Sequence, residues 1–195
     1  HDATLYAQYA HGFRAPPFED VNVGLDLPLF ATRAIPNPDL KPETSDGLEI
    51  GVRAESGALR GTASAFYNRY RDFIESKVNL GPDATGTTIF QSQNRSRARI
   101  WGVEAAGTWE LGAGAAALDG YFLRGALWYG RGDDTARDRP LNSVDPAKVV
   151  LGGGYAAPSG RWGAALLTTT TAAQDRIDEG AAPLARAPGW TTVDV

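Results

Sequence analysis

Apolar and polar residues alternate with a period of two along most of this chain, whereas the 3.6-residue repeat of an amphipathic helix is nearly absent. Successive side chains of a β-strand point to opposite faces of the sheet, so this alternation predicts strands. Residues typical of turns, such as glycine, proline and aspartate, separate the alternating segments. We therefore predict about eight strands, near residues 4–10, 47–54, 59–76, 88–111, 118–130, 147–156, 161–172 and 189–195.

Long and short connections alternate between these strands. The long connections cover residues 11–46, 79–86, 131–145 and 173–188, and the short turns cover residues 55–58, 112–114 and 157–160. Because consecutive antiparallel strands place alternate connections at opposite ends of a sheet, every long loop should lie at one end. Transmembrane β-barrels have this asymmetry, with short periplasmic turns and long extracellular loops. The pattern predicts an all-β fold, an antiparallel transmembrane β-meander of about eight strands.

The strand near residues 88–111 has a face that suits lipid. Its odd positions from Trp101 to Trp109 are apolar with a tryptophan at each end, while the even positions are small or acidic. The two tryptophans are roughly 26 Å apart along a strand, which projects to roughly 20 Å along the membrane normal at a tilt of about 40°. Tyr121 and Tyr129 bracket the next strand in the same way. We expect these four residues to form lipid-facing aromatic girdles.

Three arginines, Arg95, Arg97 and Arg99, continue the same face beyond Trp101. If the aromatic residues mark the membrane interface, these arginines lie above the outer girdle, at the level of anionic lipid head groups. The alternative is a solvated basic face at the edge of a sheet.

Composition excludes several classes of protein. The chain of 195 residues contains no cysteine and two histidines, which excludes disulfides, thiolate metal sites and most histidine-rich metal centres. A net charge of −4 gives no support for nucleic-acid binding. Mean hydropathy is −0.28, as alternating strands of a membrane barrel also give. We predict no metal site and no catalytic residue.

Eight strands can close a small barrel, but the interior of such a barrel is filled by its own side chains. The inward-facing positions here are often small. The chain also begins at His1 and ends within a predicted strand. We therefore expect residues 1–195 to be part of a larger barrel, without a plug domain and without a complete C-terminus.

The longest connection, residues 11–46, is bounded by two proline-rich segments. They read Phe13-Arg14-Ala15-Pro16-Pro17 and Pro36-Asn37-Pro38-Asp39-Leu40-Lys41-Pro42. Proline cannot occupy a helix interior and cannot donate to a sheet ladder, so both segments should be rigid, irregular chain. Loops longer than about 12–15 residues are uncommon unless they are functional or disordered. We predict an ordered extracellular loop that carries the functional site.

The two segments resemble the FRAP and NPNL boxes of TonB-dependent outer-membrane receptors, most closely the branch that takes up haem from haemoglobin. The segments Tyr67–Ile74 and Asn94–Glu104 resemble further recurrent patterns of the family. The resemblance implies a barrel of the 22-stranded type in the Gram-negative outer membrane. An N-terminal plug and a segment that contacts the TonB complex lie upstream in the family, and we expect both to be absent from this chain.

The implied activity is TonB-energised uptake of haem, or of haem from haemoproteins, with haem as cargo and with no intrinsic cofactor and no enzymatic activity. The implied partners are outer-membrane lipid, haem or a haemoprotein, and the TonB complex. A ferric-siderophore receptor and a non-transport outer-membrane barrel, such as an adhesin, are alternatives that the sequence leaves open.

Within the loop, the candidate ligand-binding residues are Phe13, Arg14, Arg33, Asn37 and Asp39. Haem receptors of this branch commonly place an axial His or Tyr between the two boxes. This chain has no His, Tyr, Met or Cys between the second proline of the first box and the first proline of the second.

The nearest candidate axial ligand is His11, which can instead form an ordinary hydrogen bond at the outer interface. Arg14 and Arg33 can pair with haem propionates, or with the carboxylates of the loop itself. For Arg14 the second, structural role is favoured, and for Arg33 the two roles are equally supported. We therefore expect the loop to be a docking surface more than a set of iron ligands.

Overall fold

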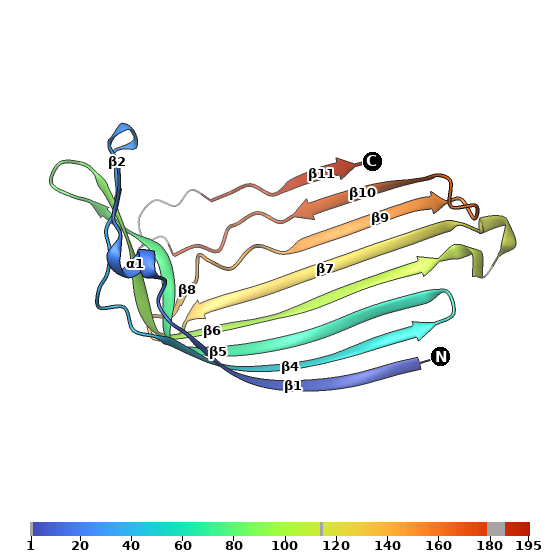
Figure 1. Ribbon diagram of the computed structural model, residues 1–195, viewed down its shortest axis with the longest axis horizontal. Coiled ribbons are helices and arrows are strands. Elements are labelled where there is room, and N and C mark those ends of the chain that lie inside the picture. The colour runs from blue at the N-terminus through green and yellow to red at the C-terminus, as the bar shows by residue number, and fades with distance from the viewer. Residues whose placement is uncertain (1, 114, 179–185) are drawn as a thin grey trace.

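The computed structural model describes residues 2–113, 115–178 and 186–195. Eight long strands form one antiparallel sheet in which each strand lies beside its neighbour in sequence (Figure 1). They are β1 Asp2–Arg14, β4 Glu43–Ser56, β5 Leu59–Pro82, β6 Thr88–Glu110, β7 Tyr121–Asp134, β9 Lys148–Ala156, β10 Gly163–Thr171 and β11 Trp190–Asp194. The predicted antiparallel meander is confirmed.

Shorter elements lie at the ends of this sheet. They are helix α1 Phe18–Asn22, strands β2 Leu25–Leu27, β3 Thr32–Ala34 and β8 Arg139–Pro140, and the 3-10 turns Pro28–Phe30, Leu111–Ala113 and Ala116–Leu118. None of the described helices is long and apolar enough to cross a membrane.

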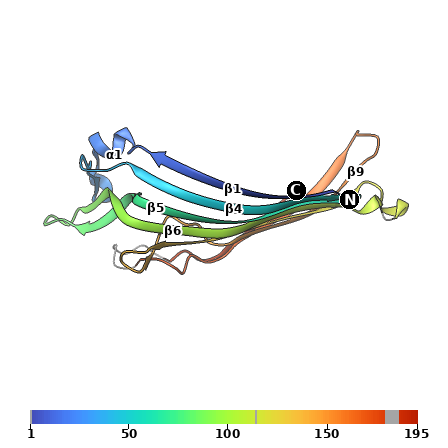
Figure 2. The ribbon, with the colours of Figure 1, turned by 90° about the horizontal axis from the view of Figure 1, so that it is seen from below.

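The sheet curves and stays open, with β1 at one edge and β11 at the other (Figures 1 and 2). Both edge strands have a partner on one side alone among the described residues, β4 for β1 and β10 for β11. This shape is that of part of a barrel wall, as the sequence predicted. The total of 22 strands stays a prediction.

The long connections do lie at one end of the sheet, together with α1, β2 and β8 (Figure 1). The strands reach further into them than predicted. Residues 11–14 and 43–46 of the predicted loop belong to β1 and β4, so the loop covers residues 15–42. The predicted loop at 79–86 shrinks to a turn over residues 83–87, because β5 runs to Pro82.

Two other connections also differ from prediction. β7 continues to Asp134, inside the predicted charged loop at 131–145. At the opposite end, the predicted tight turn at 112–114 is a longer connection with two 3-10 turns. Gly114, and residues 179–185 of the predicted last loop, lie outside the described residues.

Strand register gives the sheet one apolar and one polar face. Directly paired residues point to the same side of a sheet, and one row across it reads Leu5, Val52, Ala63, Ala105, Leu127 and Val149. The adjacent row, on the other face, reads Tyr6, Gly51, Ser64, Glu104, Trp128 and Lys148. We call the first the outer face and the second the inner face.

The predicted girdle residues all lie on the outer face, in two groups. Near the loop end, Trp101 meets Tyr129 edge to face, with ring centroids 5.9 Å apart. At the opposite end, Tyr121 lies 4.8 Å from Tyr155 between ring centroids, and Trp109 is paired with Leu123 of β7. Aromatic residues at both ends of an apolar band are typical of a membrane barrel.

A cluster of buried apolar residues lies where the loops fold over the inner face. It consists of Phe73, Ala98 and Leu141, with Tyr70, Ile100 and Val144 packed against it. It therefore stabilises the same end of the sheet that carries the long loop.

Candidate functional site

The first box closes the base of the long loop. Arg14, the last residue of β1, donates from Nη2 to Glu43 Oε2 at 2.8 Å and to the carbonyl oxygen of Ile74 at 3.0 Å. Glu43 is buried, with 6% of the residue exposed. Its Oε2 also accepts the Ile74 backbone N–H at 2.8 Å. Arg14 thus joins β1, β4 and β5, which is the structural role that the sequence favoured.

Phe13 points the other way. It pairs with Thr44 on the outer face, and 69% of it is exposed. The structure therefore places the first two candidate ligand-binding residues, Phe13 and Arg14, on different sides of β1.

The second box is fastened to β6. Asn37 donates from Nδ2 to the carbonyl oxygen of Ser92 at 2.9 Å, and its Oδ1 accepts the backbone N–H of Asp39 at 3.1 Å. Asn94 Oδ1 accepts the backbone N–H of Lys41 at 2.8 Å, and Asn94 Nδ2 donates to the Lys41 carbonyl oxygen at 3.0 Å. Asn37 therefore holds the loop, whereas the Asp39 side chain is exposed.

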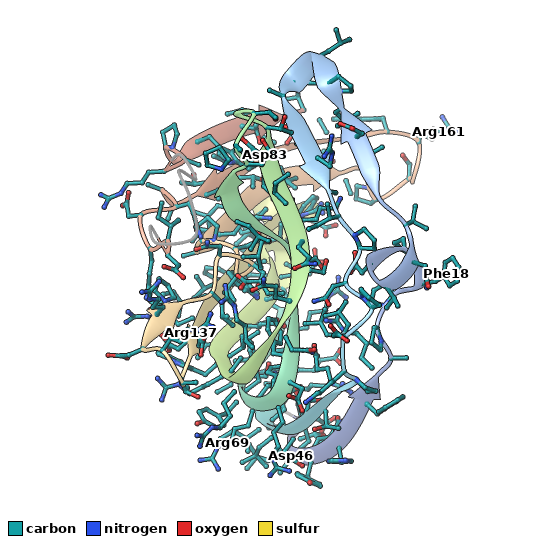
Figure 3. All side chains as sticks on the ribbon, turned by 90° about the vertical axis from the view of Figure 1, so that its left-hand side faces the viewer. Phe18, Asp46, Arg69, Asp83, Arg137 and Arg161 are labelled. Atoms are coloured by element: carbon teal, nitrogen blue, oxygen red, sulfur yellow. The ribbon has the colours of Figure 1, made fainter. Side chains whose placement is uncertain are left out.

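Between the boxes, the chain builds a small hairpin from β2 and β3. β3 runs parallel to β6, pairing Thr32–Ala34 with Thr88–Phe90, and the Ile35 N–H donates to the Phe90 carbonyl oxygen at 2.9 Å. The hairpin consequently extends the barrel wall beyond its rim (Figures 1 and 3). Order in this loop comes from pairing with a strand more than fifty residues away in sequence.

The tip of this hairpin is apolar, and it is exposed in the described part of the chain. Leu29 is 96% exposed and Phe30 is 75% exposed. Leu25 and Leu27 flank them and are also exposed. Contiguous exposed apolar residues often mark a binding surface.

Arg33 lies on the side of the same hairpin. Its Nη2 and Nε donate to Asp26 Oδ2 at 3.0 and 3.2 Å, and both side chains are about half exposed. Close by, in the β5–β6 turn, hydrogen bonds from the Thr85 hydroxyl and the Thr85 and Thr87 N–H groups hold the pKa of Asp83 below its usual value. Arg33 therefore has a loop partner but keeps exposed guanidinium surface.

His11 lies on the outer face, apart from the hairpin. Its Nδ1 is 2.8 Å from Asp46 Oδ1, which also accepts the Tyr9 hydroxyl at 2.8 Å. The structure does not bring His11 together with Arg33, Asn37 or Asp39. Its role as an axial ligand stays a prediction.

One arginine departs from the prediction for its strand. Arg95 was expected on an exposed basic face, but it is 6% exposed and its Nε lies 2.5 Å from Glu75 Oε2. Asp72 and Lys77 adopt left-handed backbone conformations in β5, and the register shifts between Glu75 and Val78. These irregularities turn the strands so that the pair is buried.

Several residues that shape the site were missed by sequence reasoning. Glu43 and Asn94 bond across strands, and their partners lie 22–53 positions away. No local pattern in the chain signals such bonds. The described residues contain no group of three or more His, Cys, Asp or Glu side chains that could hold a metal ion.

The chain is similar to known proteins over most of its length. A family model described as TonB dependent receptor-like, beta-barrel, matches residues 1–195. The Hemoglobin-haptoglobin utilization protein B of Neisseria meningitidis serogroup C is 33% identical over 89% of this chain and 24% of its own length. The Probable hemoglobin and hemoglobin-haptoglobin-binding protein 3 of Haemophilus influenzae is 32% identical over 88% of this chain and 18% of its own. The chain thus spans a quarter or less of these relatives.

Solved structures show the same architecture. The Copper transporter OprC superposes with a TM-score of 0.77 at 23% identity, covering 98% of this chain and 28% of that protein. The ferric enterobactin receptor of Pseudomonas aeruginosa superposes with a TM-score of 0.66 at 20% identity, covering 97% of this chain and 29% of the receptor. At these identities the likeness establishes the fold.

The two boxes suggested a resemblance to this family. The family match over residues 1–195, the open antiparallel meander and the two aromatic girdles all agree with it. They also place the strands in the outer membrane of a Gram-negative bacterium. The chain belongs to the TonB-dependent receptor-like β-barrel family.

Proposed function

We propose that this chain forms part of the wall and extracellular mouth of a receptor that captures haemoglobin or a related haemoprotein and takes up its haem. The names of the relatives from Neisseria and Haemophilus support this cargo. Uptake is energised by the TonB complex through residues outside this chain. Haem is the cargo of such a receptor and not its cofactor, and the chain needs no catalytic residue.

The observation that carries the proposal is the exposed apolar tip of the β2–β3 hairpin, with Leu29 at 96% and Phe30 at 75% exposure. Exposed apolar and aromatic side chains on a rigid support act as anchors in protein interfaces. Here the support is rigid because β3 pairs with β6 and the second box is fastened by Asn37. The loop also lacks a His, Tyr, Met or Cys between its boxes, which favours contact with a carrier protein over iron coordination.

The polar candidates divide between two tasks. Arg14 and Asn37 hold the loop, as their bonds to Glu43, Ile74 and Ser92 indicate. Arg33 and Asp39 keep exposed polar surface beside the tip, where they can meet polar groups at the rim of the docked partner.

The test is haemoglobin binding by the full-length receptor, measured by biolayer interferometry in detergent. Leu29→Ser should weaken binding by about tenfold, because truncating an interface anchor costs more than about 1 kcal/mol. Leu118→Ser is the matched control, since Leu118 is 42% exposed in a turn at the opposite end of the sheet.

Two results would contradict the proposal. Equal haemoglobin affinities of the two variants would remove the docking role of the hairpin tip. Binding of ferric siderophores, without binding of haemoglobin or haem, would replace the proposed cargo.

A further inference from the structure

Five arginines gather on the outer face, level with the aromatic girdle at the loop end or just beyond it. Arg69 is paired with Arg99 and Arg71 with Arg97 across β5 and β6, and Arg131 is paired with Trp101 across β6 and β7. Because directly paired residues share a face, all five point to the side that carries Trp101. We call these five residues the arginine patch.

The arginine patch has too few carboxylates to neutralise it. Arg99 is bound by Asp133 at 3.1 Å, but Asp133 is also contacted by Arg176. Arg71 is 4.0 Å from Asp46, whose Oδ1 is already bonded to Tyr9 and His11.

Arg97 and Arg131 have no ion pair in the part of the chain that the structure describes. Arg69 lies opposite Asp46 of β4, but its Nε donates to the Tyr67 hydroxyl at 3.4 Å and not to that carboxylate. All three are exposed. Like charges placed directly opposite each other on neighbouring strands destabilise a sheet. Two such Arg–Arg pairs therefore call for an anion from outside the chain.

The position of the patch identifies that anion. Arg99 and Arg97 precede Trp101 by two and four residues along β6, which is roughly 7–14 Å toward the loop end. Aromatic girdles of barrels sit at the membrane interface, so this is the level of lipid head groups. Figure 3 shows Arg69 beside Asp46 at the lower edge of the view, away from Phe18 on its right.

The same face offers a place for acyl chains below the patch. A shallow apolar depression is lined by the outer-face residues Leu5, Ile50, Val52, Ala63, Ala65 and Leu127. The small side chains Ala63 and Ala65 line it from β5, the strand that also carries Arg69. A ligand with anionic groups at one end and hydrocarbon at the other fits both the arginine patch and the apolar depression. Free phosphate would contact the arginine patch alone.

We propose that the arginine patch binds the phosphate groups of a phosphorylated lipid in the outer leaflet, whose acyl chains lie in the depression below. Guanidinium groups recognise phosphate bidentately, and clustered arginines on a rigid sheet are preorganised to do so. The lipid neutralises the paired arginines and fixes the depth of the receptor in the membrane. This proposal rests on the membrane location and is independent of the cargo.

The test uses the full-length receptor in detergent, titrated with bisphosphorylated lipid A and with its dephosphorylated form. The patch variant replaces Arg69, Arg97 and Arg131 with Gln. The control replaces Arg124, Arg137 and Arg161 with Gln, which removes the same charge from the inner face, a loop and the far turn. Heat-modifiable gel mobility confirms that each variant is folded.

The wild type and the control should bind the phosphorylated lipid with equal affinity. The patch variant should bind the phosphorylated lipid roughly a hundredfold more weakly. Each arginine near an anionic head group contributes about fivefold to the affinity, and the three factors multiply. Dephosphorylation of the lipid should weaken binding by the wild type to a similar extent. Inorganic phosphate alone, at the same concentration, should leave the thermal transition of the receptor unchanged.

Equal lipid affinity of the patch and control variants would overturn the proposal. So would a stabilisation by inorganic phosphate that matches the effect of the lipid, since the site would then bind the free anion. Haemoglobin binding, measured on the same samples, reports separately on the proposed function and should be the same in all three proteins.

Discussion

Two arginine–glutamate pairs in this chain differ mainly in their exposure to water. Glu75 and Arg95 have side chains 9% and 7% exposed, and Glu110 and Arg60 have side chains 47% and 64% exposed. Breaking a buried pair leaves an uncompensated charge, whereas an exposed pair is screened by water. The buried pair should therefore stabilise the loop end of the barrel far more than the exposed pair stabilises the other end.

We expect Glu75→Gln to lower the free energy of unfolding by about 3 kcal/mol, and Glu110→Gln by less than about 1 kcal/mol. Urea unfolding of the full-length receptor in micelles, followed by tryptophan fluorescence, measures both. Similar midpoint shifts for the two variants would show that the Glu75–Arg95 pair is solvated in the native barrel.

Asn37 tests how the second box is held. We expect Asn37→Ala to raise amide hydrogen exchange in residues 36–41 by about fivefold to tenfold, since two hydrogen bonds of about 1 kcal/mol are lost and part is recovered by water. The control is Asn22→Ala, because Asn22 is exposed and donates one bond, to the Phe18 carbonyl oxygen at 3.0 Å. Unchanged exchange in residues 36–41 would mean that β3–β6 pairing alone orders the box.

Strand β5 shows how one element serves two environments. Ala63 lies on the outer face opposite Ala105, while the next residue, Ser64, lies on the inner face opposite Glu104. A positive charge placed at residue 63 would face lipid, whereas a positive charge placed at residue 64 would lie opposite the Glu104 carboxylate. The two positions make a matched pair for testing the assignment of the faces.

We expect Ala63→Arg to destabilise the barrel by roughly 2–4 kcal/mol, as arginine does near the bilayer midplane. Ser64→Arg should have little effect, because Glu104 lies opposite it. The fraction of full-length receptor that folds into lipid vesicles, measured by heat-modifiable gel mobility, distinguishes the two. A larger loss for Ser64→Arg would reverse the assignment of the faces.

The same strand also marks the limit of the sequence prediction for single elements. Alternation predicted the strand from Leu59 to about Ser76, with its start and its faces, because side-chain direction in a strand is set locally. The extension from Lys77 to Pro82 was missed, and Lys77 has a left-handed backbone conformation that interrupts the alternation there. Pairing with β6 maintains the strand through these irregularities.

The open edges of the sheet matter for the molecule as a whole. β1 and β11 each present one unpaired side in the described structure. Unpaired strand edges associate with other chains in the absence of a partner strand, and they are costly in lipid. The neighbouring strands of the full-length receptor would supply the missing partners.

We therefore expect residues 1–195, produced alone in detergent, to form mixed oligomers, while the full-length receptor behaves as a single species. Size-exclusion chromatography with light scattering measures the mass of each. A monodisperse monomer of the short chain with native strand content would show that these eight strands are stable without their neighbours.

Local patterns in the chain were enough to predict the strands, their apolar and polar faces, the ends at which the loops lie and the two proline-rich anchors. All of these depend on residues close together in sequence. The role of Asn37 in fastening the loop, the parallel pairing of β3 with β6 and the burial of Arg95 came only from the three-dimensional arrangement. They depend on strand register and bulges, which are set by contacts between residues tens of positions apart. The long loop was therefore predictable as an ordered site, whereas the projection of its apolar tip away from the sheet was decided by the pairing of β3 with β6.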